Sequence, residues 1–180
     1  DYYNVAKCII SNVVSLHAPD EVKLVIVCNA FQKKKLSVFN NLPHSWSSDK
    51  KRRFVAADKS EVYALFSEID ESITTRELQL SKEDLRIPHY VVLVFDQTLI
   101  DDIPFKKKML DKNNTFGVST VFFSEKYKGI PKECEAVIQK NADACGMYVK
   151  NENDNHFLSF EFDHIDDCSV DELIYGLSKI

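Results

Sequence analysis

An aspartate that directly follows an apolar strand is the residue best placed to do chemistry in this 180-residue chain. Asp96 comes after Tyr90–Phe95, a continuous apolar stretch. Ligands of open parallel sheets bind outside the carboxyl ends of the strands, where a carboxylate can hold Mg²⁺ beside a nucleotide phosphate. Aspartate also favours turns and helix caps. Asp96 therefore has two interpretations, a weak Walker B-like nucleotide-binding position or a cap.

The other residues of a nucleotide-hydrolysing site do not occur in the sequence. A G-x-x-x-x-G-K-[ST] loop would cradle phosphates with its backbone N–H groups, but the glycines are too far apart to form one: Gly117, Gly129, Gly146 and Gly176. Gln97 follows Asp96, where hydrolytic enzymes usually carry a glutamate, and glutamine cannot accept a proton as a general base. We expect no catalytic residue, no bound cofactor and no ATP hydrolysis in this chain as it stands.

The spacing of histidines and cysteines gives no sign of metal binding. The histidines form no i,i+4 pair and the sequence has no Cys-x-x-Cys, so no metal ligand is predicted. Cys8 and Cys28 fall within apolar patterns, which predicts reduced, buried thiols of a cytoplasmic protein. The stretch Asn151–Asn155 faintly resembles a calcium loop but lacks its glycine and distal glutamate. A hairpin turn is the preferred interpretation there.

Composition narrows the class of protein. Lys+Arg 23 against Asp+Glu 28 leaves a net charge of −5, which argues against a nucleic-acid partner because DNA binding needs a basic face. The longest apolar runs are about six residues, whereas a membrane helix needs about 20. We expect one folded domain over residues 1–180. The absent initiator methionine predicts a fragment of a larger chain, with any membrane segment outside it.

Three basic clusters and one tryptophan each have a functional and a structural interpretation. Lys33–Lys35, Lys50–Arg53 and Lys106–Lys108 could contact anionic lipid or an acidic neighbour, or form ordinary solvated surface. Trp46 could belong to an exposed contact loop, but packing is favoured because an indole buries a large apolar area.

Apolar periodicity predicts an α/β fold in which helices alternate with buried strands. We expect helices over Tyr3–His17, Phe31–Phe39, Asp58–Leu80 and Pro104–Lys112, and a last one opening at Ser169. We expect strands over Lys23–Cys28, Arg53–Ala56, Tyr90–Phe95, Ser119–Phe123 and Ala136–Gln139. This alternation predicts a mostly parallel sheet with helices on both faces. Near the C-terminus, apolar residues on either side of 151–155 predict a hairpin that adds an antiparallel edge.

The helix patterns also predict which residues cap and which face the core. The long central helix is expected to open with a capping box of Asp58 and Glu61, and the last helix with one of Ser169 and Glu172. The first helix is expected to turn one apolar stripe toward the core: Val5, Cys8, Ile9, Val13 and Leu16.

The order of the segments resembles one family. Leu42-Pro43-His44 is followed by the Arg53–Ala56 strand, the strand that ends at Asp96, and Ile130-Pro131-Lys132-Glu133-Cys134. In this order they resemble FtsK/SpoIIIE-type ATPase modules, and more narrowly those of the EssC-type membrane-anchored ATPases of type VII secretion systems. The resemblance covers nearly the whole chain, and it is to the degenerate module nearest the membrane more than to the active ones.

The resemblance implies a RecA/FtsK-like three-layer sandwich in the cytoplasmic part of a cell-membrane protein. The parent protein would be an ATPase using ATP and Mg²⁺, while this module would couple membrane segments to the active motors without hydrolysing ATP. The implied partners are neighbouring ATPase modules of the same chain, further copies of the parent in a homo-oligomer such as a hexamer, and other membrane components of the secretion system. Only Asp96 matches a functional position of the family.

Two features separate this chain from the active modules. Those modules carry Asp-x-Lys-Gly-Gly after the strand that matches Leu24–Cys28, where this chain has Asn29-Ala30-Phe31-Gln32. Their Walker A loop would lie before the first helix, upstream of Asp1. A nucleotide-binding module whose phosphate-binding loop lies outside the sequence is therefore the alternative function.

Overall fold

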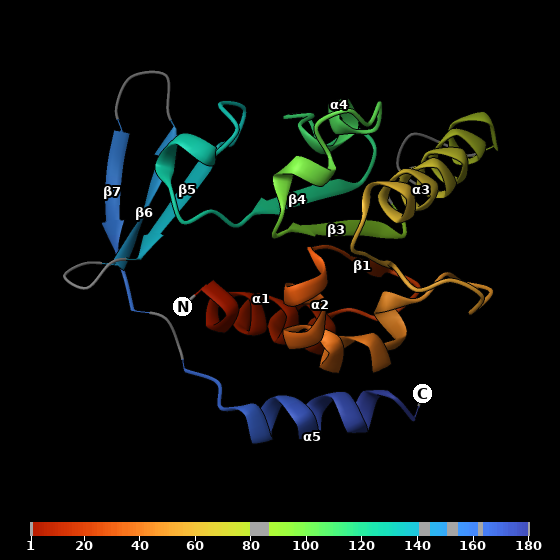
Figure 1. Cartoon of the computed structure of the whole chain (residues 1–180), viewed down its shortest axis with the longest axis horizontal. Helices are drawn as coiled ribbons and strands as arrows, with labels where there is room; N and C mark the ends of the chain where they lie inside the picture. The colour runs from red at the N-terminus through yellow and green to blue at the C-terminus, as the bar shows by residue number, and fades with distance from the viewer. Residues whose placement is uncertain (1, 80–86, 141–144, 151–154, 162–163, 180) are drawn as a thin grey trace.

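A four-stranded parallel sheet lies between two layers of helices (Figure 1). The computed structural model describes residues 2–79, 87–140, 145–150, 155–161 and 164–179. The strands lie in the order β2-β1-β3-β4, and all neighbours are parallel. Their bounds are β1 Val22–Val27, β2 Val55–Ala56, β3 His89–Val94 and β4 Val118–Phe122. The predicted α/β class, with a mostly parallel sheet and helices on both faces, is confirmed.

The two central strands are buried because helices cover both of their faces. Every residue of β1 is buried, as expected for a strand in the middle of a parallel sheet. It pairs with β3 over its full length, from Val22 opposite His89 to Val27 opposite Val94. The pairing with β2 is short, only Ile26 opposite Val55 and Val27 opposite Ala56. β1 and β3 therefore form the rigid centre of the domain.

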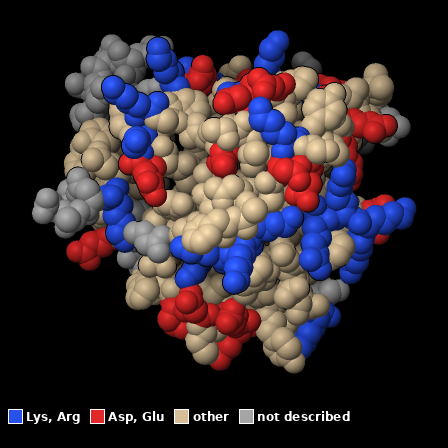
Figure 2. Space-filling model, in the orientation of Figure 1, with Lys and Arg blue, Asp and Glu red and all other residues tan. Residues whose placement is uncertain are grey.

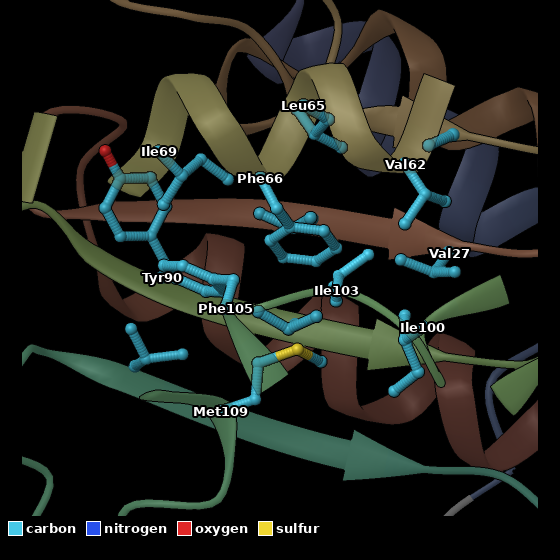
Figure 3. Close-up of a cluster of buried hydrophobic side chains, with 14 of the residues drawn as sticks. Val27, Val62, Leu65, Phe66, Ile69, Tyr90, Ile100, Ile103, Phe105 and Met109 are labelled. Carbon is cyan, nitrogen blue, oxygen red and sulfur yellow. The ribbon is translucent and has the colours of Figure 1, made fainter. Parts of the chain in front are cut away.

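Two helices cover one face of the sheet. They are α3 (Lys59–Gln79) and the short α4 (Lys106–Met109). Figure 3 shows α3 directing Val62, Leu65 and Phe66 toward this face, where they meet side chains from the strands and from the segment before α4. Phe66 stacks on Phe105 with 5.0 Å between the ring centroids. This cluster holds α3 on the sheet.

The opposite face is covered by helices from both ends of the chain. α1 (Tyr2–Leu16), α2 (Ala30–Lys35), the 3-10 segments η1 (Ser37–Asn41) and η2 (Pro43–Ser45), and α5 (Asp167–Leu177) belong to this layer. Apolar side chains of α1, η1 and α5 share one cluster with Leu24, Ile26 and Leu93 of the strands. The end of the chain therefore returns to pack on its beginning.

The C-terminal strands form a sheet of their own. β5 (Ala136–Lys140), β6 (Cys145–Lys150) and β7 (Asn155–Ser159) are antiparallel neighbours in that order. The hairpin was expected to extend the parallel sheet as an antiparallel edge. The antiparallel hairpin itself is confirmed, but its expected place is wrong, because β6 and β7 pair with β5 and with each other rather than with β4. The predicted turn at 151–155 lies largely outside the described residues.

The predicted core face of α1 is confirmed at Cys8, which is buried, but the rest of it is one residue out of register. The deepest side chains are Ala6, Ile10 and Val14, an i, i+4, i+8 stripe whose small first residue allows close approach to the sheet. Val13 is only partly buried, and Leu16 is 75% exposed. Both stripes have helical spacing, so the pattern alone could not choose between them.

Of the two predicted helix caps, one is confirmed and the other is wrong. Asp58 Oδ1 accepts from Glu61 N at 2.8 Å, which confirms Asp58 as a cap, while Glu61 Oε2 accepts from Ala57 N at 2.7 Å. The last helix is capped by Asp166, which accepts hydrogen bonds from both the backbone and the hydroxyl of Ser169. Ser169 is thus the donor inside the first turn and not the cap.

A buried histidine in η2 contacts the end of α1. His44 is 1% exposed, and its Nε2–H donates to the carbonyl oxygen of His17 at 2.8 Å. Its Nδ1 has no hydrogen-bond partner among the described residues. Burial, together with the nearby charges of Lys23 and His17, lowers the pKa of His44 below its ordinary value. The neutral ring is therefore the form that the fold accepts.

Replacing Phe66 by alanine should lower the free energy of unfolding by about 3–5 kcal/mol, because it removes a buried ring and leaves a cavity beside Phe105. Tyr63→Ala on the same helix is the matched control, since Tyr63 is 59% exposed. Urea denaturation of both variants measures the difference. Equal, small losses would show that α3 is not packed as described.

Stability should fall as the pH drops below about 6.5, because unfolded His44 then takes up a proton that the folded state resists. The contribution of neutral His44 to the free energy of unfolding is complete above the pKa of His44 in the unfolded chain. It is lost as the pH falls toward the lower pKa of His44 in the folded state. One such group gives a slope of at most about 1.4 kcal/mol per pH unit. His44→Gln should flatten this part of the profile, and His164→Gln, at an exposed position, should not. Urea denaturation at pH 7.5 to 5 provides the measurement, and an unchanged slope in His44→Gln would contradict the assignment.

Candidate functional site

The crevice where this fold would bind a ligand lies between β1 and β3. The chain leaves β1 toward β2 and then crosses back past β1 to enter β3. Adjacent connections therefore depart to opposite sides, and such a switch point is where open α/β sheets bind ligands at the carboxyl ends of their strands. The residues that follow β1 and β3 here are Cys28, Asn29, Phe95 and Asp96.

Asp96 stands at this edge of the sheet, half-buried, with one oxygen engaged in a local turn. Its Oδ1 accepts from Thr98 N at 3.1 Å and from Thr98 Oγ1 at 2.6 Å. These bonds make Asp96 the cap of the 3-10 segment η4 (Gln97–Leu99). The position agrees with a Walker B-like aspartate, and the bonds agree with a cap. Binding of Mg²⁺ or nucleotide at Asp96 stays a prediction.

Aromatic rings pack together where β3 and β4 end and α1 begins. Phe95 and Phe123 directly follow β3 and β4, and their rings stack at 4.4 Å with an interplanar angle of 5°. Tyr2 and Tyr3, at the start of α1, pack on them: Tyr2 lies 6.1 Å from Phe95 and 6.0 Å from Phe123, and Tyr3 lies 5.9 Å from Phe95. We call Tyr2, Tyr3, Phe95 and Phe123 the aromatic cluster.

The polar groups at the end of β1 are occupied by α2. Asn29 caps that helix, and its side chain and that of Gln32 each accept a backbone N–H of the other residue. Gln32 Nε2 also donates to Phe95 O at 3.4 Å and to the hydroxyl of Tyr2 at 3.5 Å. Gln32 thus ties the end of β1 to the end of β3. These donors stabilise the protein's own backbone.

The one thiol at this edge is unsuited to nucleophilic chemistry. Cys28 is fully buried, and burial raises its pKa to about 11. The thiolate that would attack a substrate is therefore scarce at neutral pH. Desolvation also raises the pKa of Tyr3, aided by the hydrogen bond from Tyr2. Both groups stay neutral under physiological conditions.

The basic clusters lie on the surface next to acidic side chains. Arg52 pairs with Glu68 at 2.8 Å and also donates to Ala64 O, while Lys108 pairs with Asp70 at 2.8 Å. Figure 2 shows basic and acidic residues lying side by side over the face it draws. Such pairs add little stability, but they neutralise much of the charge. This supports the interpretation as solvated surface.

Trp46 and the remaining candidates have local roles. Trp46 is half-buried and bridges to Arg53, whose guanidinium lies 4.7 Å from the centre of the indole. Within the described ranges, no group of three or more His, Cys, Asp or Glu side chains could hold a metal ion. All five cysteines are free thiols. No helix in the described part of the chain is long and apolar enough to cross a bilayer.

Two known proteins are similar to this chain, one in sequence and one in fold. No protein-family model matches the sequence. The chain is 22% identical over 156 residues to the ESX secretion system protein EccC of Geobacillus thermodenitrificans, a match that covers 86% of this chain and 10% of EccC. Its fold matches the cytoplasmic domain of EssC with a TM-score of 0.60 at 13% identity, covering 98% of this chain and 41% of that structure.

These matches confirm the predicted resemblance to EssC-type modules. One match rests on sequence and the other on fold. The structural match at 13% identity speaks for the fold alone. The chain spans about a tenth of the length of EccC and matches one part of that protein.

Sequence reasoning identified Asp96 but missed the aromatic cluster. Its members are far apart in the chain, so no local motif joins them. One signal was available: Phe95 and Phe123 each come directly after a strand, and the carboxyl ends of neighbouring parallel strands lie together. The position of Tyr2 and Tyr3 against them depends on the direction of α1, which the sequence pattern does not give.

Asp96→Ala should lower the free energy of unfolding by about 0.5–2 kcal/mol, because η4 loses its cap. Asp96→Asn should cost less, since asparagine also accepts the N–H of Thr98. Urea denaturation of the two variants beside the parent protein provides the measurement. If alanine were tolerated without loss, the two hydrogen bonds to Thr98 would not be a stabilising cap.

Proposed function

We propose that this domain is a non-hydrolytic coupling module of a type VII secretion ATPase. It would link membrane segments of the parent protein to the active motor modules and transmit movement between them during protein export. In this role the domain would sit on the cytoplasmic side of the membrane. The resemblance to EccC and to the cytoplasmic domain of EssC supports the family context.

The aromatic cluster is the observation that carries the non-hydrolytic role. Phosphate sites in this fold class are lined by backbone N–H groups at a helix N-terminus, whereas here the first turn of α1 places Tyr2 and Tyr3 against Phe95. Gln97 stands where a catalytic acid would polarise water. Rings packed on one another at this edge favour a structural role over turnover. ATP and Mg²⁺ would then be cofactors of the parent protein and not of this domain.

The alternative function is nucleotide binding with a phosphate-binding loop supplied from upstream. Asp96 at the carboxyl end of β3 is the observation that favours it, because its Oδ2 makes no hydrogen bond to the neighbouring Thr98. A carboxylate so placed could hold a Mg²⁺ water. This alternative requires Tyr2 and Tyr3 to move away from Phe95.

The proposed partners of this domain are suggested by the length of its relatives. The chain spans about a tenth of EccC, so neighbouring modules of the same polypeptide are the first partners. Further copies of the parent, in a hexamer or another homo-oligomer, and membrane components of the secretion system are the next. Nucleic acid is not expected, given the net charge of −5.

Titration of MgATP into the domain with its native upstream residues should show no binding with a micromolar Kd. Such a Kd would correspond to a binding free energy of about −8 kcal/mol. Isothermal titration calorimetry makes the measurement, with an active module of the parent as positive control. In the parent protein, Asp96→Ala should leave ATPase activity largely intact.

Thr98→Val is the matched control for Asp96→Ala, because it removes the hydroxyl contact to Asp96 and keeps the carboxylate. Micromolar MgATP binding that disappears in Asp96→Ala and persists in Thr98→Val would overturn the non-hydrolytic role and support the alternative. Loss of parent activity in both variants would point to the stability of the cap.

A further inference from the structure

Two exposed lysines of α2 lack the acidic partners that several other basic side chains have. Lys34 and Lys35 form no ion pair within the described ranges, whereas Lys33 beside them pairs with Glu61 at 3.4 Å. Phe31 lies three and four residues before them, on the same side of the helix, and is 72% exposed. We call Phe31, Lys34 and Lys35 the basic patch. It combines an exposed ring with two positive charges that face no carboxylate.

The outer side of α5 carries the opposite charge. Asp171 and Glu172 are exposed and form no ion pair in the described part of the chain, whereas Asp167, one turn earlier, pairs with Lys7 of α1. Tyr175 lies three and four residues after them and is 66% exposed. We call Asp171, Glu172 and Tyr175 the acidic patch. It has the same make-up as the basic patch, with the sign of the charge reversed.

The two patches belong to one face of the domain. α2 and α5 are both part of the helix layer on the same side of the sheet, and η1, which directly follows α2, packs against α5. Figure 2 shows basic side chains over α2 and acidic side chains over the start of α5 on the face that it draws. Val170 and Ile174 direct the inner side of α5 into the core, so the acidic patch points away from the domain.

A second copy of the chain is the partner that fits both patches at once. When two copies face each other across a two-fold axis, the basic patch of each lies opposite the acidic patch of the other, and every contact is made twice. The opposite charges then fix the register of the two copies, while Phe31 and Tyr175 supply apolar area. An unrelated acidic protein or an anionic lipid would match the basic patch alone.

We propose that this face is a self-association surface, on which two copies pair through the basic and acidic patches about a two-fold axis. The proposal names one contact of the homo-oligomer suggested above. It rests on surface charge, so its failure would leave the coupling role untouched, because that role is tested by MgATP binding. The charges are exposed, so the pairing should be weak and should weaken further as the salt concentration rises.

Sedimentation velocity over a wide range of protein concentration tests the pairing. The protein should pass from monomer to dimer, and Lys34→Glu combined with Lys35→Glu should raise the Kd of the dimer at least about tenfold, because like charges then face each other. Lys107→Glu combined with Lys112→Glu is the matched control, since it changes the net charge equally at exposed positions in and after α4, on the other side of the sheet. A protein that stays monomeric throughout, or a dimer that responds equally to both double variants, would overturn the proposal.

Mixing two reversed proteins tests whether the patches face each other. Asp171→Lys combined with Glu172→Lys should also raise the Kd of the dimer at least about tenfold. When this protein is mixed with the double variant at Lys34 and Lys35, both contacts again join opposite charges, and a heterodimer should form with about the parent Kd. A protein that carries all four reversals should likewise recover its own dimer. If each double variant keeps the parent circular dichroism spectrum but neither combination restores the dimer, the proposed contact is wrong.

Discussion

Burial of β1 and β3 on both faces is the constraint on which the rest of the structure depends. Each fully buried Val, Leu or Ile contributes about 1.5–3 kcal/mol, and β1 is buried throughout its length. Such strands need a helix layer on each side, and parallel neighbours need crossovers to return the chain. Both needs are met by α3 and α4 on one face and by α1, α2 and α5 on the other. The carboxyl ends of the strands therefore gather at one edge.

The side chains at that edge are engaged with one another. The stacked rings of Phe95 and Phe123, with Tyr2 and Tyr3 packed on them, continue the apolar core beyond the strands. Asn29 and Gln32 use their polar groups to cap α2 and to bond the end of β3. Hydrocarbon from these rings therefore occupies much of this edge of the sheet. The geometry therefore favours a domain that holds neighbouring parts together.

The sequence predicted the strands well because strands buried on both faces leave a continuous apolar run that needs no knowledge of the neighbours. It also placed Asp96 at a strand end. It failed where two solutions share one pattern: α1 could turn either of two stripes to the sheet, and the C-terminal hairpin could join either sheet. Ser169 was predicted as the cap of the last helix. Asp166, three residues earlier, is an equally good capping residue, and the sequence pattern could not choose between the two. The aromatic cluster joins residues from three separate segments, so only the fold could reveal it.

A crystal structure of the longer protein with Mg²⁺ and a non-hydrolysable ATP analogue tests the central claim most directly. The account predicts that Tyr2 and Tyr3 keep their places on Phe95 and that no nucleotide lies beside Asp96. A nucleotide seated at the end of β3, with its metal on Asp96 and both tyrosines displaced, would contradict it.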